Sequence, residues 1–411
     1  MKILMCHKFN FPLGGAETYL FDLCDGLRRL GHTIINFSTS NVRNLYSDYS
    51  RYFVKEIDFS KILFCRPIYN FKSGLKFIYS FEAKKNIECL INKYKPDIAH
   101  IHNIYHHITP SILKVLKKYG IPIVMTIHDY KLICPNYSLF TRNSPCERCK
   151  NGNYFNAIIY KCLQGSYLGS FLGCLEMYFS KIFKLYEDNI DLFIAPSVFV
   201  KNKLVDFGID VKKIYYLPYA INLEGFNPRF NNGRYILYFG NISFKKGIDT
   251  LLISAKNFSN TSFKIIGDGP DKVKLELFAC REKLANVEFL GYRRREDLAD
   301  FIRNALFVVI PSKWYEVCGL NIFESFASGK GVIASNIGGI PEFIDDGYTG
   351  LLFNPGDPDD LSEKISYLLN NSSKIEELGR NGFERIHRIN DQKEHYRILL
   401  NIYNQLLTNN N

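Results

Sequence analysis

Two glutamates lie in one short stretch of the sequence, with a spacing that could serve the binding of a sugar and a nucleotide. Glu316 and Glu324 are separated by seven residues, and Gly319 lies between them. The stretch predicts a strand, a glycine turn and a short helix that begins near Leu320. The first N–H groups of a helix and the positive end of its dipole bind anions such as diphosphate, and glycine lets the backbone approach them closely.

The two carboxylates would then have different tasks. Glu316 precedes the predicted helix and could accept hydrogen bonds from sugar hydroxyls, whereas Glu324, about one turn inside it, could bind both hydroxyls of a ribose. Taken alone, the spacing is equally compatible with two ordinary acids on a surface helix. The glycine-rich residues that follow, 325–342, favour the binding site, because they predict a second strand and a second glycine turn.

The elements that would hold these residues alternate between strand and helix along the whole chain. In the first half we expect strands at 2–6, 33–38, 97–102, 121–128 and 192–195, with helices at 16–29, 110–118 and from a Ser197 cap to 205. In the second half we expect strands at 235–239, 263–266, 287–289, 306–310, 331–334 and 349–353, with helices at 247–255, 359–369, 374–388 and 393–407. This alternation predicts an α/β fold with parallel sheets covered on both faces.

The chain of 411 residues is too long for one ordinary core, and turn residues at 217–233 mark a boundary. We predict two doubly wound, Rossmann-like domains, residues 1–216 and 217–389, that face each other across a cleft. A final helix at about 390–411 is expected to pack back on the first domain. Ligands bind at the carboxyl ends of the strands in such sheets, which is where the glutamate stretch lies.

The positive charge is confined to the first half of the chain. Residues 1–215 contain 29 Lys and Arg against 17 Asp and Glu, whereas residues 216–411 contain 23 against 24. This asymmetry predicts an anionic partner, either a membrane surface or a phospholipid-linked substrate, or else a lysine-rich solvated surface. No basic helix of a known docking motif appears, so we expect no nucleic acid partner.

The cellular location that we expect depends on two features that the sequence lacks. The first eight residues do not resemble a signal peptide, and no charge-free run of eighteen apolar residues occurs, so we expect a cytoplasmic protein without a membrane-spanning helix. The aromatic segment 154–186 indicates either a surface that meets the inner face of the membrane or a buried helix pair.

Several motifs, in the order in which they occur, resemble those of glycosyltransferase family 4, a family of retaining enzymes with the GT-B fold. The resemblance rests on Phe9–Glu17, Gly31-His32, Pro218–Pro228, Tyr238–Gly247, Ile265–Pro270, Val287–Tyr292 and Pro311–Glu342, and so covers nearly the whole chain. It implies transfer of a sugar, with retention, from a nucleotide diphosphate sugar. The acceptor would be a glycan or a polyprenyl-linked glycan of surface polysaccharide synthesis.

The resemblance also implies roles for single residues. Lys246 matches the lysine that binds the donor diphosphate, His128 matches a histidine that contacts the transferred sugar, and His102 lines the acceptor side. Glu316, His128 and Lys246 are thus the catalytic candidates. The donor-binding candidates are Gly15, Asn241, Lys245, Gly269, Tyr292, Gly319, Leu320 and Glu324. We treat His106 and His107 as surface residues.

One position departs from the family pattern. Asn241 stands directly after Gly240, where the family carries an arginine. A charged guanidinium, which can form two parallel hydrogen bonds to a phosphate, is thus replaced by a neutral amide. Either Lys245 compensates, or Lys246 and backbone N–H groups hold the diphosphate alone. The departure leaves an inactive donor-binding partner subunit open as an alternative, and a GT-B sugar-nucleotide epimerase is the alternative within enzymes.

Four cysteines occur in one insert and include a Cys-x-x-Cys pair. Cys134, Cys146, Cys149 and Cys162 permit tetrahedral zinc, which would brace an acceptor-side loop and take no part in catalysis. Their outer spacings are not those of a standard zinc finger, and thiols or a disulfide are the alternatives. We expect catalysis itself to require no cofactor, because Lys246 and a helix terminus can carry the charge of the leaving group.

Overall fold

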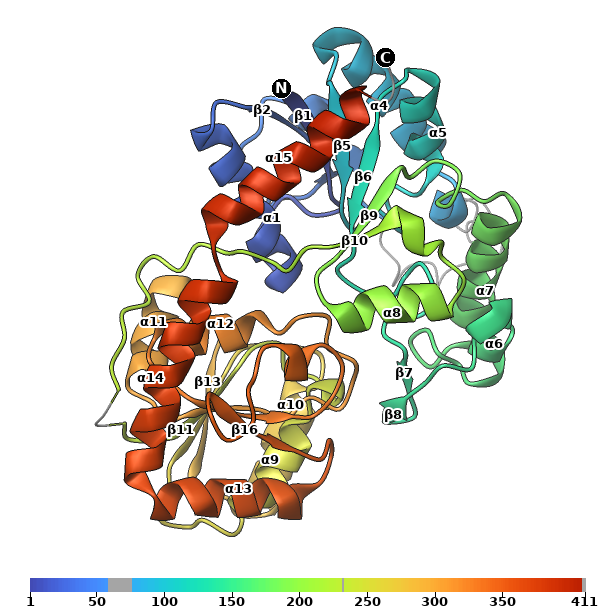
Figure 1. Ribbon diagram of the computed structural model, residues 1–411. Helices are drawn as coiled ribbons and strands as arrows, with labels where there is room; N and C mark the ends of the chain where they lie inside the picture. Colours follow the sequence, from blue (N-terminus) through green and yellow to red (C-terminus); the bar gives the residue numbers. More distant parts are fainter. Residues whose placement is uncertain (58–75, 231–232, 409–411) are drawn as a thin grey trace. The chain divides into compact units, whose positions relative to one another are not determined.

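The computed structural model describes residues 1–57, 76–230 and 233–408 (Figure 1). These residues form two compact units. Unit 1 consists of residues 1–141, 146–219 and 393–411, and unit 2 consists of residues 142–145 and 220–392. Each unit is built around its own parallel sheet. No helix within the described ranges has the length and apolar character needed to cross a bilayer.

Unit 1 contains a six-stranded sheet in the order β10-β9-β6-β5-β1-β2, with every neighbouring pair parallel. Its strands are β1 (Lys2–Cys6), β2 (Thr33–Phe37), β5 (Ile98–Ile101), β6 (Ile123–Thr126), β9 (Leu192–Ala195) and β10 (Ile214–Tyr216). Short strands outside it are β3 (Thr39–Ser40), β4 (Val54–Lys55) and β7 (Phe140–Thr141). Every residue of β5 and β6 is buried, as expected for parallel strands covered on both faces.

Some helices of unit 1 cover this sheet, and others lie outside it (Figure 1). They are α1 (Gly15–Arg29), α4 (Phe81–Tyr94), α5 (Ser111–Lys118), α6 (Asn156–Ile159), α7 (Tyr167–Ile182), α8 (Val198–Asp206) and α15 (Gln392–Thr408). The Ser197 hydroxyl caps α8 as predicted, accepting a hydrogen bond from the N–H of Val200 at 3.2 Å. Helix α15 is bound to the core of unit 1 by two buried hydrogen bonds, from His395 to Tyr19 and from Tyr403 to His100.

Unit 2 contains a second six-stranded parallel sheet, in the order β13-β12-β11-β14-β15-β16. Its strands are β11 (Ile236–Phe239), β12 (Phe263–Ile266), β13 (Val287–Gly291), β14 (Val308–Ile310), β15 (Val332–Ser335) and β16 (Gly350–Phe353). The short strand β8 (Ser144–Pro145) lies outside this sheet. Its helices are α9 (Ile248–Ala255), α10 (Lys272–Arg281), α11 (Arg295–Arg303), α12 (Leu320–Ala327), α13 (Pro358–Asn370) and α14 (Ser372–Ile389).

Both sheets reverse their strand order at one point, and this places the candidate residues. In unit 1 the reversal lies between β1 and β5, and in unit 2 it lies between β11 and β14. The loops that leave these strands open a crevice at the carboxyl edge of such a sheet. His102 follows β5 directly, and the loops after β11 and β14 carry Lys246 and Glu316.

The elements that the sequence did not predict are α4, α10, α11, β10 and the short strands β3, β4, β7 and β8. Helix α10 buries only Leu275 and Ala279, and its helical period is weak. Helix α11 buries Ala299 and Ile302 and has a clear apolar side, a signal that the prediction missed.

Candidate functional site

The loops after β11 and β14 of unit 2 are held against each other by their backbones. The N–H of Lys313 donates a hydrogen bond to the carbonyl of Lys245 at 2.9 Å. Gly247 has a φ of +71°, and a Cβ atom there would lie 1.7 Å from the carbonyl oxygen of Pro311. Glycine is therefore required at position 247 by both its backbone conformation and the closeness of the second loop.

This contact brings Lys246 and Glu316 together. The Lys246 Nζ donates to Oε1 of Glu316 at 2.6 Å, and the Ser312 hydroxyl donates to the same oxygen at 2.5 Å. Glu316 is only 6% exposed. Burial raises the pKa of its carboxyl, but Lys246 and the hydrogen bonds from Ser312 and Trp314 outweigh burial, so the pKa lies below its ordinary value. Glu316 is therefore a buried, ionised carboxylate.

The second glycine turn holds the backbone of Glu316. The N–H of Gly339 donates to the carbonyl of Glu316 at 2.8 Å. Gly338 has a φ of +64°, and a Cβ atom there would come within 2.4 Å of the Glu316 nitrogen. The residues after β15 thus fix the backbone position of Glu316. Both glycine turns that the sequence predicted therefore lie next to this one residue.

Helix α12 begins four residues after Glu316, and no side chain caps its amino terminus. Its N-cap is Gly319, with a φ of +85° and no side chain that could bond to the first N–H groups. These N–H groups and the helix dipole are suited to an anionic ligand. Leu320 and Glu324 are both partly exposed at this end of the helix.

The remaining donor candidates surround the β11 loop. The Lys245 ammonium lies 4.2 Å from the centroid of the Trp314 ring, and Asn241 is exposed. A Cβ atom on Gly269 would lie 2.3 Å from the carbonyl oxygen of Ile242, so the 267–269 turn packs directly on the residues after Asn241. Tyr292 is 65% exposed.

In unit 1, His128 has both ring nitrogens in hydrogen bonds. Its Nδ1 lies 2.6 Å from the Tyr219 hydroxyl, and its Nε2 lies 2.7 Å from Nδ1 of His102. The Tyr219 hydroxyl also lies 3.1 Å from the carbonyl of Ile127. Its single proton can serve either this carbonyl or His128 Nδ1, and the direction of the hydrogen bond between His128 and His102 follows from that choice.

His102 has one buried ring nitrogen that these hydrogen bonds do not use. Its Nε2 atom has no hydrogen-bond partner among the described residues. Burial lowers the pKa of both His102 and His128, with neighbouring histidines adding to the effect, so both rings are neutral. A buried polar atom without a partner is suited to a hydroxyl group, which can either donate or accept a hydrogen bond.

The structure adds candidates after β1 that the sequence analysis missed. The Nε2 of His7 lies 2.8 Å from Oε1 of Glu17 on α1, and both side chains are buried. The Lys8 ammonium lies 3.9 Å from the centroid of the Tyr105 ring, and the Tyr105 hydroxyl donates to Asp129. The only signal in the sequence was their position directly after a strand at the reversal point of the sheet.

Gly14 and Gly15 give helix α1 an exposed, uncapped start. Gly14 is its N-cap and offers no side chain to the first N–H groups, and Gly15 is exposed. The glycine loop therefore leaves N–H groups available to a ligand, as its family resemblance implies.

The predictions from the sequence for two histidines are wrong. His107 is buried, and His106 lies 3.3 Å from the buried Glu176, so neither is a surface residue. The four cysteines lie near one another: burial, and then the charges of Cys134, Cys162 and Cys146, raise the pKa of the Cys149 thiol. Among the described residues, no group of three or more His, Cys, Asp or Glu side chains is found that could hold a metal ion. A structural zinc bound by these cysteines stays a prediction.

Comparison with protein families identifies the chain. The model of Glycosyltransferase Family 4 matches residues 13–224, which is more than half of the chain, and the model of glycosyl transferases group 1 matches residues 222–385. The protein belongs to glycosyltransferase family 4. The family resemblance inferred from the motifs is thereby confirmed.

Individual relatives of this family 4 protein span nearly the whole chain. An uncharacterised glycosyltransferase of Methanocaldococcus jannaschii is 28% identical over 389 residues, covering 93% of each chain. A 42.6 kDa protein from the cps region of Klebsiella pneumoniae is 27% identical, covering 83% of this chain and 87% of its own. Among solved structures, HepE of Anabaena with UDP and glucose has a TM-score of 0.69 at 17% identity, covering 98% of this chain and 100% of its own. The predicted GT-B fold is confirmed.

Proposed function

We propose that this glycosyltransferase moves a sugar, with retention, from a nucleotide diphosphate sugar to a glycan or lipid-linked acceptor. The observation that carries the proposal is the pair of Lys246 and the buried Glu316, together with the start of α12, which no side chain caps. A cation, an oriented carboxylate and the amino terminus of a helix are the groups needed to bind a diphosphate and a sugar. They lie on the loops that leave β11 and β14, at the point where the sheet reverses.

The leaving diphosphate would be stabilised by Lys246 and the first N–H groups of α12. Glu316 binds Lys246 and Ser312 through the same oxygen, Oε1. This carboxylate would orient a sugar hydroxyl, and Glu324 would take the ribose hydroxyls. Lys245, held against Trp314, would supply part of the charge that Asn241 lacks.

Unit 1 would present the acceptor. The buried Nε2 of His102 could form a hydrogen bond with a sugar hydroxyl, while His128, itself bound to Tyr219, holds the ring in place. His128 would contact the transferred sugar only if the sugar displaced one of its two hydrogen-bond partners. The exposed glycine loop at Gly14 and Gly15 would add N–H groups for phosphate.

A role in surface polysaccharide synthesis at the inner face of the membrane fits both the distribution of charge along the chain and the proteins to which the chain is similar. The positive charge lies in residues 1–215, which suits an acceptor linked to a polyprenyl phosphate. The relative from the Klebsiella pneumoniae cps region supports the pathway, and the UDP and glucose bound to HepE support a nucleotide sugar as donor.

The test is a panel of nucleotide sugars read by thermal shift, followed by transfer to an acceptor glycan. We expect one donor to raise the unfolding temperature clearly more than the others and the product to keep the anomeric configuration of that donor, read by NMR. A product of inverted configuration would contradict retention. An absence of both transfer and donor hydrolysis, despite donor binding, would favour the second candidate, an inactive donor-binding subunit, which Asn241 motivates.

A further inference from the structure

Helix α7 has its polar and apolar sides reversed relative to an ordinary surface helix. The residues it buries are small or polar, apart from Met177 and Cys174: Ser170, Gly173, Glu176 and Ser180. The residues it exposes are apolar and large: Tyr167, Leu168, Phe171, Leu175 and Ile182. A helix that covers a core normally does the opposite, so the outer face of α7 is the feature that needs an explanation.

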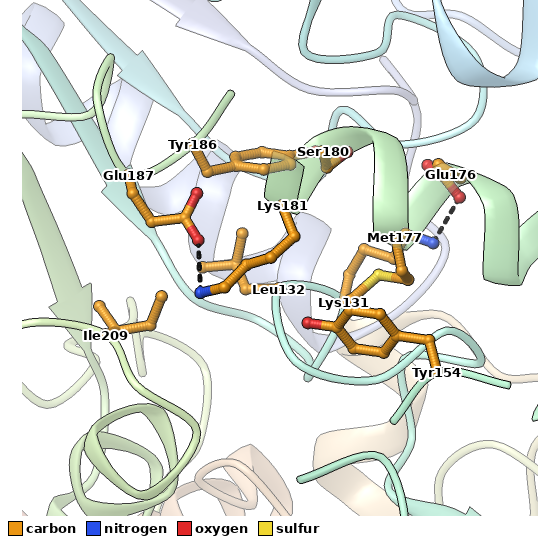
Figure 2. Close-up of a pocket in the computed structure, with 10 residues that line it drawn as sticks. All are labelled: Lys131, Leu132, Tyr154, Glu176, Met177, Ser180, Lys181, Tyr186, Glu187 and Ile209. Carbon is orange, nitrogen blue, oxygen red and sulfur yellow. Dashed lines mark hydrogen bonds and ion pairs between the residues drawn. The ribbon is translucent and has the colours of Figure 1, made fainter. Parts of the chain in front are cut away.

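The inward face of α7 is fixed by charge. Oε2 of Glu176 accepts a hydrogen bond from Lys131 Nζ at 2.6 Å, and this pair lies at the cavity beneath the helix (Figure 2). Both side chains are almost fully buried, at 2% and 5% exposure. Rotating α7 to bury its apolar side would expose this pair and leave Lys131 without its carboxylate, so the reversed orientation is anchored.

The outward residues form one continuous stripe. Residues 167, 171, 175 and 182 follow one another at intervals of four or seven, which places them on one side of an α-helix. Ile182 is 72% exposed and Phe171 is 47% exposed. Phe183, the C-cap residue, and Phe155 and Ile159 on and beside α6 are exposed as well, so the stripe is part of a wider apolar surface.

Lysines accompany this stripe. Lys161, Lys181 and Lys184 are exposed, and the Lys161 ammonium lies 4.2 Å from the centroid of the Tyr167 ring. The only acid on α7 is Glu176, which points inward to Lys131. Lys181 is partly neutralised by Glu187 at 3.0 Å, also seen in Figure 2. The outer side of α7 therefore combines large apolar side chains with a positive rim, as amphipathic helices at membrane surfaces do.

We propose that the outer face of α7, defined by Tyr167, Leu168, Phe171, Leu175 and Ile182, docks on an anionic lipid bilayer. The apolar stripe would enter the boundary between headgroups and acyl chains, with Lys161, Lys181 and Lys184 at the level of the headgroups. A second copy of the chain fits less well, since an isologous contact would bring the lysines of both copies together. The proposal rests on the proposed function only in making the acceptor lipid-linked; the docking itself does not depend on sugar transfer.

The test is flotation of the full chain with vesicles of phosphatidylcholine alone or mixed with phosphatidylglycerol. We expect binding to the anionic vesicles at low salt, with weak binding to neutral vesicles and release by high salt. The triple variant Phe171→Ser, Leu175→Ser and Ile182→Ser should bind at least about tenfold less, because each change removes apolar surface that the lipid would bury. The triple variant Lys161→Gln, Lys181→Gln and Lys184→Gln should lose the preference for anionic lipid.

The matched control is Ile253→Ser, Val273→Ser and Leu277→Ser, which removes three exposed apolar side chains from α9 and α10 of unit 2. It should bind vesicles like the wild type. Wild-type binding that is absent, or equal in the α7 serine variant, would overturn the proposal, as would a dimer in solution that the serine changes dissociate. Thermal shift with a nucleotide sugar should be unchanged in every variant, which separates a failure of docking from a failure of the proposed function.

Discussion

The Nζ of Lys246 lies 2.6 Å from Oε1 of Glu316, and the two residues come from loops that follow β11 and β14. These strands are adjacent in the sheet although their loops are seventy residues apart in the chain. The pair couples a cation suited to phosphate with a carboxylate suited to a sugar. Each side chain fixes the other in the absence of a ligand, so the site is organised before the donor binds.

Removing Lys246 should therefore affect catalysis far more than folding. We expect Lys246→Ala to lower kcat/KM by about 10²–10³-fold, as the loss of one preorganised electrostatic contact to a leaving group does elsewhere. The matched control is Lys256→Ala, which breaks an exposed ion pair of the same length, 2.6 Å to Glu282. Steady-state kinetics with the donor found by the panel would check this. Equal losses in the two variants would remove Lys246 from the site.

At position 241 a substitution should strengthen the binding of a nucleoside diphosphate rather than weaken the function of the site. Asn241 is exposed beside the loop of Lys245 and Lys246, so an arginine side chain has room there. We expect Asn241→Arg to bind a nucleoside diphosphate about tenfold more tightly, because a guanidinium makes bidentate bonds to phosphate. Asn241→Lys should gain less and serves as the charge-matched control. Isothermal titration would measure both, and a gain equal for arginine and lysine would point to charge alone.

The sequence was sufficient to predict the parts of the fold that depend on local patterns. Both alternating sets of strands and helices carry a strong apolar period, and glycines such as Gly319 mark where helices begin after strands. The prediction missed α10, which buries two residues and has a weak helical period, and it also missed α11, although the apolar side of α11 is clear. The helical state of α10 depends on the sheet against which it packs, and no local window of the sequence contains that sheet.

The candidate site was predictable to the same extent. Lys246 and Glu316 stood out because each follows a strand in a recognisable motif. Tyr219 and Glu17 lie within the motifs at 218–228 and 9–17, but their pairings with His128 and His7 across the fold could not be predicted from the sequence. The spacing of the cysteines predicted that they lie together, and the structure places Cys134, Cys146 and Cys162 near enough to Cys149 to raise the pKa of its thiol in addition to the effect of burial.

Tyr219 should be important for stability as well as for the histidine tautomers. In Tyr219→Phe, the carbonyl of Ile127 and Nδ1 of His128 both lose the hydroxyl of this side chain as a hydrogen-bond partner. We expect the free energy of unfolding to fall by about 2 kcal/mol, the cost of leaving buried polar groups unsatisfied. Urea denaturation would measure it. Tyr46→Phe, at a tyrosine that is 91% exposed, should change it little, and a similar loss in both variants would contradict the assignment.

Lys8 should give the protein a pH-dependent stability in the alkaline range. Burial lowers the pKa of its ammonium from the ordinary value of 10.5 to about 8, against the opposing charges of Asp129 and Glu17. Between pH 8 and pH 10.5 the unfolded chain thus binds more protons at Lys8 than the folded chain, so this group makes stability rise with pH there. The difference in unfolding free energy between the wild type and Lys8→Met should move in favour of the wild type across this range. A difference in unfolding free energy that does not change with pH would show that the Lys8 ammonium is not desolvated.

Gly247 tests whether the contact between the two loops of unit 2 holds the site together. In Gly247→Ala the new Cβ atom would lie 1.7 Å from the Pro311 oxygen, so one of the loops has to move. The control is Gly120→Ala, where φ is similar, +67°, but a Cβ atom would meet nothing within 4 Å. We expect the control to lose about 1 kcal/mol of unfolding free energy, the cost of a left-handed backbone, and Gly247→Ala to lose clearly more.

Activity should separate the two glycine variants further. Displacing the β11 loop shifts Lys246, which is fixed to Glu316 at hydrogen-bond distance, and misplacement of a catalytic group by about 1 Å can cost 10²-fold in rate. We expect Gly247→Ala to lose most of its transferase activity at a temperature where it is still folded, while Gly120→Ala keeps the activity of the wild type. Equal stability and equal activity in the two variants would mean that the loop contact at Pro311 does not position Lys246.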